Sequence, residues 1–303
     1  MILPPNLKPG DTVGILATAR KITETELQPF LSLLKEWQLQ PLLGKSIGAV
    51  DNQFAGNDAL RTQDFQEMLD NPKVKAIWCA RGGYGTVRMI DGLDFSAFKK
   101  NPKWVIGYSD VTVLHNTLYN LGVASLHAQM GLEIEQKTEA TRKTIYDVLF
   151  GKSYKIEYTS EGNLNRIGTA EGELVGGNLS VLSSLLGSPS AIETKGKILF
   201  LEDLDEYLYH IDRMIQNLKR NGLFSELKGL IIGGMSQMND NAIPFGKTAE
   251  EIIWDAVKEY EYPVCFHVPA GHIKDNRALL LGSDVELSVS AKKVTLQFNN
   301  LKS

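Results

Sequence analysis

The sequence contains little cysteine, and both of its cysteines, Cys79 and Cys265, lie inside apolar segments far apart in the chain. Such spacing predicts two buried thiols and excludes a disulfide framework. No apolar run approaches the ~20 residues that cross a bilayer. Pro4 and Pro5 interrupt the region where a signal peptide would have its apolar segment. These absences favour a cytoplasmic protein.

Neither sign of charge dominates, since 32 basic and 36 acidic residues give a formal net charge of −4. No run of like charges occurs, which argues against nucleic acid or an anionic membrane as the main partner. With 43% hydrophobic residues, the 303-residue chain is expected to bury a packed core. This length allows two domains or one large α/β domain.

The first half alternates short apolar runs with segments of helical periodicity. Alternating strands and helices predict right-handed crossovers and a mostly parallel sheet, whose ligands collect at the carboxyl ends of the strands. Two polar segments, CARGGYG and IGYSD, follow predicted strands there. The predicted strands are residues 11–17, 74–80 and 104–108, and the predicted helices are residues 23–37, with an early interruption at Pro29, 55–70 and 111–122.

The pattern changes after a further helix at residues 138–151. Residues 153–177 are rich in Gly, Asn and Thr with period-two stretches, which predicts a linker passing into β structure. We therefore expect one domain at residues 1–155 and a second at residues 168–303. In the second, strands at 197–202, 229–234 and 263–268 alternate with helices at 206–222 and 248–260, and residues 277–298 alternate like antiparallel strands.

Ser109 is the first candidate for chemistry. It follows an apolar strand and Gly107, and a helical pattern begins directly after it. A turn of this kind exposes a side chain and directs the amides of the new helix toward it, as at a nucleophile elbow. The usual Gly-x-Ser-x-Gly is not met, because Asp110 and Val111 follow. The alternative is that Ser109 or Asp110 simply caps the helix.

A nucleophilic serine needs a base, and His272 is the best-placed histidine. It lies in the loop VPAGHIKDN directly after a strand, where functional residues concentrate. His115 is about 9 Å further along the helix that Ser109 begins, so packing is its expected role. Of the remaining histidines, His127 is expected to line the cleft, His210 to face solvent and His267 to lie in the core.

An orienting carboxylate completes such a set. Glu202 ends a fully apolar strand, whereas Asp203, Asp205 and Glu206 are expected to cap the following helix. A metal site using Cys265, His267, His272 and Asp275 is a weaker alternative, because these residues lack the usual ligand spacings.

The glycine-rich segment ARGGYGT, residues 80–86, has three interpretations. Its glycines allow backbone amides to approach an anion, and Arg81 could hold a substrate carboxylate. It has neither the Lys-Ser/Thr of a Walker loop nor Gly-x-Gly-x-x-Gly spacing. A plain glycine turn is the third interpretation.

Six segments in the same order together resemble the serine LD-carboxypeptidases, a family that also contains the microcin-immunity peptidases. They run from residue 7 to residue 276, so the resemblance covers nearly the whole chain. The segments are LKPGDTVGILATA, ARGGYGTVRMID, WVIGYSDVTVLH, LVGGNLSVL, LFLEDLDEYLYHIDRMI and PAGHIKDN.

The resemblance implies an α/β fold, with an amino-terminal flavodoxin-like domain, a smaller β-rich carboxyl-terminal domain and an active site in the cleft between them. A homodimer is implied, without metal or organic cofactor. The implied roles are nucleophile for Ser109, acid for Glu202, base for His272, oxyanion hole for the amides of Asp110 and of Gly82 or Gly83, and substrate binding for Arg81, Tyr108, Asn178 and His127. Where the family often has His-Gly-Pro, this chain has His127-Ala128-Gln129, which affects the shape of the cleft.

The implied reaction is release of D-alanine from a murein tetrapeptide that ends in diaminopimelate-D-alanine, through an acyl-enzyme. One alternative is an immunity-type peptidase that cleaves aminoacyl-nucleotide conjugates. A tryptophan in a substrate loop of the second domain would favour it, but Trp254 is in a predicted amphipathic helix. The alternative from another class is a non-catalytic protein that binds muropeptides or small anions.

Overall fold

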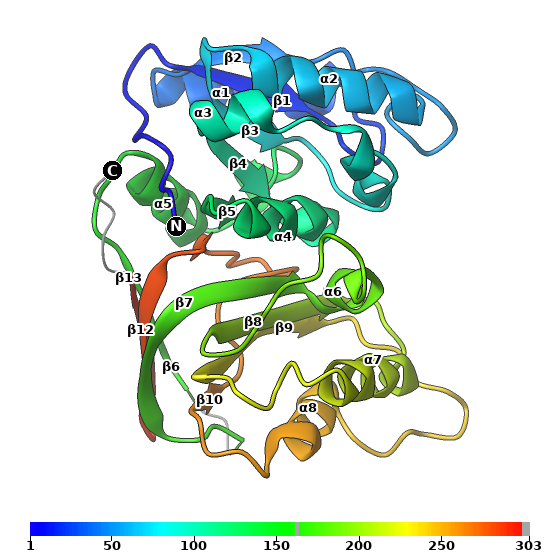
Figure 1. Cartoon of the computed structure of the whole chain (residues 1–303), viewed down its shortest axis with the longest axis vertical. Coiled ribbons are helices and arrows are strands. Elements are labelled where there is room, and N and C mark those ends of the chain that lie inside the picture. Colours follow the sequence, from blue (N-terminus) through cyan, green and yellow to red (C-terminus); the bar gives the residue numbers. More distant parts are fainter. Residues whose placement is uncertain (161–163, 299–303) are drawn as a thin grey trace.

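The computed structural model describes residues 1–160 and 164–298, which form two β-sheets with helices packed on them (Figure 1). The first sheet has the strand order β11-β5-β4-β3-β1-β2, and the second has the order β10-β9-β8-β7-β12-β13-β6. The α/β class predicted from the sequence, with a parallel first sheet and a second β-rich part, is confirmed.

The first sheet has the flavodoxin-like order 2-1-3-4-5, and β1 to β5 pair in parallel. Helices α1 and α5 pack on one face, and α2, α3 and α4 pack on the other. The strands are β1 (Thr12–Leu16), β2 (Gln40–Leu43), β3 (Val74–Cys79), β4 (Trp104–Gly107) and β5 (Ser125–His127). The helices are α1 (Glu24–Glu36), α2 (Asp58–Asp70), α3 (Ser96–Lys100), α4 (Thr112–Asn120) and α5 (Glu139–Leu149).

Helix α1 runs through Pro29 without interruption, contrary to the sequence prediction. Leu27, Phe30 and Leu34 are buried on its inner face, while Pro29 is exposed on the outer face. The proline ring therefore points to solvent, and burial of the apolar face outweighs the one backbone hydrogen bond that proline cannot make.

The second sheet buries one face under α6, α7 and α8. The side chains on its other face join the core formed by α1, α5 and one face of the first sheet. Its strands are β6 (Lys155–Thr159), β7 (Gly168–Asn178), β8 (Ile198–Leu204), β9 (Gly229–Ser236), β10 (Val264–Cys265), β12 (Asp284–Val289) and β13 (Lys293–Phe298). The helices are α6 (Leu179–Leu185), α7 (Leu208–Arg220) and α8 (Ala249–Val257), and one-turn 3-10 helices occur at Thr86–Arg88, Ile90–Gly92, Ser109–Val111 and Ile134–Gln136.

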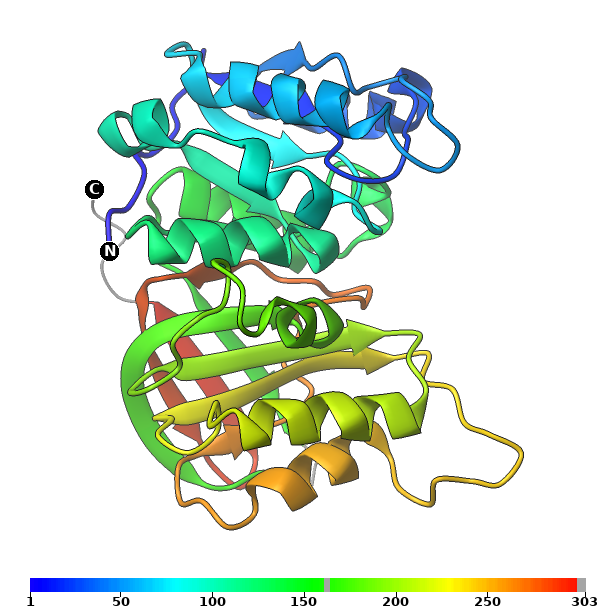
Figure 2. The same ribbon diagram turned by 45° about the vertical axis from the view of Figure 1, so that its right-hand side comes forward.

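Strand β11 (Leu279–Leu281) connects the two halves, because it leaves the carboxyl-terminal part and pairs antiparallel with β5 in the first sheet. Helix α4 also lies between the two halves in both views (Figures 1 and 2) and contacts β7 and α6. The division into domains at residues 155 and 168 stays a prediction, and residues 161–163 of the expected linker lie outside the described residues.

Several short elements have no clear signal in the sequence. Strand β2 is largely exposed, and β5 and α6 are too short to show a clear period. His267, predicted to lie in the core, is exposed with φ of 61°, because β10 ends two residues earlier and the chain turns there. Among residues 1–160 and 164–298, no helix is long and apolar enough to span a membrane.

Candidate active site

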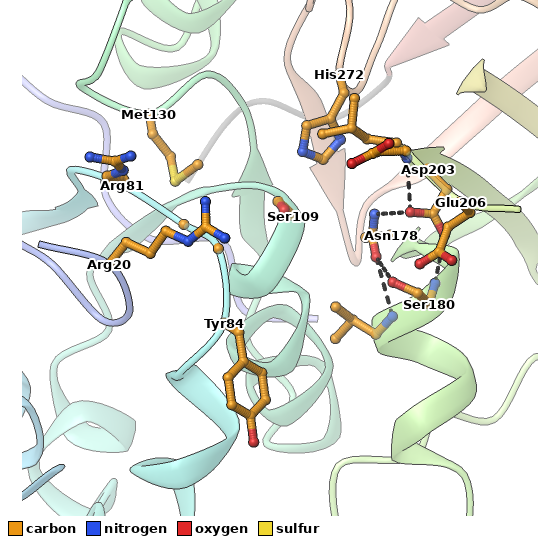
Figure 3. Close-up of a pocket in the computed structure, with 15 residues that line it drawn as sticks. Arg20, Arg81, Tyr84, Ser109, Met130, Asn178, Ser180, Asp203, Glu206 and His272 are labelled. Carbon is orange, nitrogen blue, oxygen red and sulfur yellow. Dashed lines mark hydrogen bonds between the residues drawn. The ribbon is translucent and has the colours of Figure 1, made fainter. Parts of the chain in front are cut away.

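A cavity of about 470 Å³ opens where the carboxyl ends of β3, β4 and β8 meet (Figure 3). Six of the residues predicted to form the site line this cavity, namely Ser109, His272, Arg81, Gly82, Gly83 and Asn178. Glu202, Asp110, Tyr108 and His127 are the predicted residues that do not line it; all four are buried behind its wall.

Ser109 lies on a tight turn between β4 and α4, with φ of 61°. A residue other than glycine rarely adopts this left-handed backbone conformation, which costs about 1–3 kcal/mol and persists only where the surrounding structure imposes it. Gly107 lets the turn close, because a Cβ atom at this position would lie 2.8 Å from the Val111 side chain. The serine is thereby held on a strained turn with its side chain at the cavity, as at a nucleophile elbow.

The Asp110 side chain anchors the glycine-rich loop beside this turn. It is buried, and its carboxylate accepts hydrogen bonds from the Thr86 backbone amide at 2.8 Å and the Thr86 hydroxyl at 2.6 Å. Burial raises the pKa of the Asp110 carboxyl, with these bonds acting in the opposite direction. The sequence predicted a backbone amide for the oxyanion hole or a helix cap at this residue, and its side chain instead accepts the two hydrogen bonds from Thr86.

Gly82 and Gly83 present backbone amides beside Ser109. Within the described part of the chain, neither amide donates a hydrogen bond, so both are free to bind an anion. A Cβ at Gly82 would lie 3.6 Å from the Ser109 Cβ, which places the loop directly against the serine. Gly83 has φ of 117° and packs under the Arg20 side chain, whose atoms leave no space for a Cβ.

Glu202 and His272 form a buried pair. The Nδ1 atom of His272 lies 2.7 Å from Oε2 of Glu202, and the His272 backbone amide donates to the same oxygen at 3.1 Å. The Glu202 side chain is fully buried, whereas His272 reaches the cavity. Gly271 has φ of 101° and permits this contact, because a Cβ there would lie 2.6 Å from Oε2 of Glu202.

The pKa values of the two groups shift in opposite directions. Burial alone would lower the pKa of His272, but the charge of Glu202 and its hydrogen bond raise it above the ordinary value. Burial alone would raise the pKa of Glu202, but His272 holds it below the usual range. The pair therefore favours a negative Glu202 beside an imidazole that binds protons more tightly than usual.

Opposite charges face each other across the cavity (Figure 3). Arg20 and Arg81 lie on the side of the glycine-rich loop, and Asp203 and Glu206 lie on the side of β8. Arg81 donates to the Lys21 carbonyl at 3.0 Å. Within residues 1–160 and 164–298, the Arg20 guanidinium has no ion-pair partner, so it is available to an anionic ligand.

Tyr108 and His127 lie behind the cavity. The Tyr108 ring centroid is 4.8 Å from that of His272 and 5.9 Å from that of His127. His127 is completely buried, and burial lowers its pKa to about 4. The geometry thus offers no direct contact between His127 and a ligand, because β5 directs its ring inward toward Phe200.

Two other histidines have the environments expected for them. His115 is buried, with its ring nitrogens near the Ser125 hydroxyl at 2.8 Å and the Gly107 carbonyl at 2.9 Å. His210 is partly exposed and contacts Glu206 at 2.6 Å. Among the described residues, no three His, Cys, Asp or Glu side chains are grouped as metal ligands.

The lining also contains residues that the sequence did not indicate as site residues, namely Arg20, Tyr84, Met130, Ser180, Val181 and Leu204. Asp203, Asp205 and Glu206, predicted only to cap a helix, line it as well. Arg20 follows β1 by a few residues, so the rule that ligands collect at carboxyl ends of strands could have indicated it. Met130 carries no such signal. Only the packing of the chain after β5 brings it beside Gly82.

Comparison with known proteins gives two family matches. The LD-carboxypeptidase N-terminal domain matches residues 13–128, and the LD-carboxypeptidase C-terminal domain matches residues 171–287. A probable murein peptide carboxypeptidase of Bacillus subtilis (strain 168) is 35% identical, with 97% of this chain and 94% of that protein covered. The microcin C7 self-immunity protein of Escherichia coli is 25% identical, with 95% and 93% covered.

Among solved structures, the muramoyltetrapeptide carboxypeptidase from Oxalobacter formigenes has a TM-score of 0.86 and 27% identity. The superposition covers 96% of this chain and 100% of that one. The structural similarity therefore extends over both sheets.

Proposed function

Because this chain belongs to the LD-carboxypeptidase family, we propose that it is a serine carboxypeptidase that releases the terminal D-alanine from murein tetrapeptides. One observation carries the proposal. A serine on a strained turn and a histidine paired with a buried glutamate line the same cavity, in a chain that matches this family along nearly its whole length.

In the proposed acylation step, Ser109 Oγ attacks the carbonyl carbon of the residue before the terminal D-alanine. His272 takes the hydroxyl proton on Nε2, while Glu202 accepts the Nδ1–H and stabilises the imidazolium. The free amides of Gly82 or Gly83, together with the amide of Asp110, stabilise the tetrahedral oxyanion. His272 then gives the proton to the departing amine, and D-alanine leaves.

The proposed deacylation reverses these roles. His272 takes a proton from water, and the resulting hydroxide attacks the ester carbonyl on Ser109. Breakdown of this second tetrahedral intermediate breaks the ester bond and returns the proton to Ser109. The products are a tripeptide and free D-alanine.

The charges of the cavity suit such a substrate. The carboxylate of the D-alanine is proposed to bind near Arg81, and the unpaired Arg20 guanidinium offers a second cation on the same side. Arg81 lies in the glycine-rich loop, and the Arg20 side chain packs against Gly83 of the same loop. Both cations are therefore close to the amides proposed to stabilise the oxyanion, where the leaving D-alanine would lie.

The test is mass spectrometry of L-Ala-γ-D-Glu-diaminopimelate-D-Ala incubated with the wild type and with Ser109→Ala. Loss of one alanine with the wild type alone supports the proposed reaction and the nucleophile together. Cleavage by both proteins contradicts the role of Ser109, and an intact tetrapeptide with both contradicts the substrate.

A second candidate is amide hydrolysis of aminoacyl-nucleotide conjugates, favoured by the 25% identity to the microcin C7 self-immunity protein. Tyr84, 52% exposed at the cavity, is an aromatic side chain on which a base could stack. Trp254 is not among the residues that line the cavity, and the Arg166 guanidinium lies 4.7 Å from its ring centroid. Aminoacyl-sulfamoyl adenylates are therefore the compounds to test after the tetrapeptide.

We also propose that the enzyme acts in the cytoplasm as a homodimer. Cell fractionation with a specific antibody tests the location. Light scattering during size-exclusion chromatography tests the assembly, and a mass of about 34 kDa, close to the 33.6 kDa of one chain, would contradict the dimer.

A further inference from the structure

Asn178, predicted to bind substrate, has no hydrogen-bonding capacity left for a ligand. Its Nδ2 donates to Oε1 of Glu202 at 3.2 Å and to Oδ1 of Asp203 at 3.0 Å. Its Oδ1 accepts from the Ser180 hydroxyl at 2.8 Å and from the Val181 amide at 3.2 Å. A carboxamide has two N–H donors and two lone pairs, and all four are in use.

Asp203 is held as firmly as Asn178. It is 2% exposed, and its Oδ1 also accepts from its neighbour's amide, that of Leu204, at 2.8 Å. Its Oδ2 accepts from the Ser180 amide at 2.9 Å, at the start of α6. These hydrogen bonds hold the Asp203 carboxylate in one orientation, in which Oδ1 accepts a hydrogen bond from the Asn178 carboxamide.

The strand geometry that brings two carboxylates to one amide is unusual. Consecutive residues of a regular strand point to opposite faces of the sheet, yet Glu202 and Asp203 both reach Nδ2 of Asn178. The register of β8 against β9 shifts between Leu201 and Asp203, which supplies the required irregularity. Two like charges are thus placed side by side, with one amide between them.

We propose that Asp203 and Asn178 are positioning residues for the reaction of Ser109. Asp203 fixes the Asn178 carboxamide, and this carboxamide holds Oε1 of Glu202, so that Oε2 stays aligned with Nδ1 of His272. The proposal rests on the proposed function, since it extends the Ser109–His272–Glu202 set by two residues.

Asp203 also adds a charge to the site. Burial, followed by the charge of Glu202, raises the pKa of Asp203 to about 7, and Glu206 acts in the same direction. Ionised Asp203 in turn raises the pKa of His272, which Lys137 lowers. The other charged groups facing this cluster are His127, behind Glu202, and Arg20, Arg81 and Asp205 around the cavity.

Asn178→Asp separates positioning from folding. Aspartate has the same size and can also accept from the amides at the start of α6, but it offers at most one O–H donor in place of the two N–H donors that hold the two carboxylates. We expect kcat to fall by about tenfold or more with KM changed by less than about threefold. A raised KM at unchanged kcat would show that Asn178 contacts the substrate and would overturn the proposal.

Asp203→Asn tests the charge. Asparagine keeps the oxygen that accepts from Asn178 and Leu204 but loses the negative charge and the oxygen that accepts from the Ser180 amide. The pKa of His272 should therefore fall, and the acidic limb of kcat/KM should move to lower pH. Asp91→Asn, which removes an exposed carboxylate outside the cavity, is the matched control and should leave the limb in place. An unmoved limb in Asp203→Asn, or an equal shift in both variants, contradicts the proposal.

NMR titration of His272 in isotope-labelled protein distinguishes failure of this proposal from failure of the proposed function, because it needs no substrate. A lower pKa of His272 in Asp203→Asn than in the wild type supports the role of Asp203, even if the tetrapeptide is not cleaved. An equal pKa in the two folded proteins overturns it.

Discussion

The backbone of Ser109 is strained because the residue carries a Cβ atom in a left-handed conformation. Glycine adopts φ near 61° without steric cost, whereas an L-residue pays about 1–2 kcal/mol. Ser109→Gly is therefore expected to abolish turnover and to raise the free energy of unfolding by up to about 1 kcal/mol, measured by urea denaturation.

Ser109→Ala is the matched control for this prediction. It removes the same hydroxyl but keeps the Cβ, so the strain remains and stability should change by less than about 0.5 kcal/mol. Equal stability of the two variants would show that the turn stores no strain.

The pH dependence of catalysis follows from His272. It must be neutral to accept a proton, and its pKa lies above the ordinary value of 6.5. We expect kcat/KM to rise with pH through a midpoint above 6.5 and to reach a plateau on the alkaline side. A midpoint below 6.5 in the pH profile would contradict the pairing with Glu202.

The same pair contributes to stability within a defined pH window. The contribution of Glu202, whose pKa is lowered from 4.5, is lost as pH falls through its folded value. That of His272, whose pKa is raised from 6.5, is complete below 6.5 and is lost as pH rises through its folded value. Glu202→Gln should therefore lose most stability relative to the wild type between about pH 4.5 and 6.5, as thermal unfolding across pH would reveal.

At the scale of one element, α1 shows local and tertiary preferences in competition. A capping box fixes its start: the Thr23 amide donates to Glu26 at 2.7 Å, and the Glu26 amide donates to Thr23 at 3.3 Å. Pro29 opposes the helix in its interior but lies on the exposed face. Pro29→Ala should raise the free energy of unfolding by about 1–3 kcal/mol in urea denaturation.

Gln28→Ala, an exposed neighbour in the same helix, is the control and should change stability by less than about 0.5 kcal/mol. A loss of stability in Pro29→Ala would mean that the proline contributes more by restricting the unfolded chain than it costs the helix.

At the scale of the molecule, β11 makes the two sheets dependent on each other. Leu280 is fully buried in this strand and pairs with Leu126 of the first sheet. The strands before and after it in the chain, β10 and β12, belong to the second sheet. Leu280→Ala should lower the free energy of unfolding by about 2–5 kcal/mol while unfolding remains a single transition. Ser288→Ala, at an exposed position of β12, is the control.

The measurement compares two probes of unfolding. Of the four tryptophans, Trp254 alone lies in the second half, so a Trp254→Phe background reports the first half by fluorescence, while circular dichroism reports both. Coincident curves support the coupling, and separate curves would show that the halves unfold independently.

The sequence alone determined the periodic elements and the order of the motifs. Alternation of apolar strands with helices predicted a mostly parallel first sheet, because hydrophobic periodicity is a local property of the chain. Its flavodoxin-like order was implied only by the family resemblance. Six short segments in one order identified the family, and the comparisons confirm it. The carboxyl ends of strands correctly indicated where Ser109 and the glycine-rich loop would lie.

Only the tertiary structure decided what each polar side chain does. It placed Glu202 behind His272, left His267 exposed and used up the carboxamide of Asn178. It also returned β11 to the first sheet. These outcomes depend on contacts between segments distant in sequence and on a register shift in β8. Neither produces a periodicity or a motif spacing in the sequence, so neither could be predicted from it.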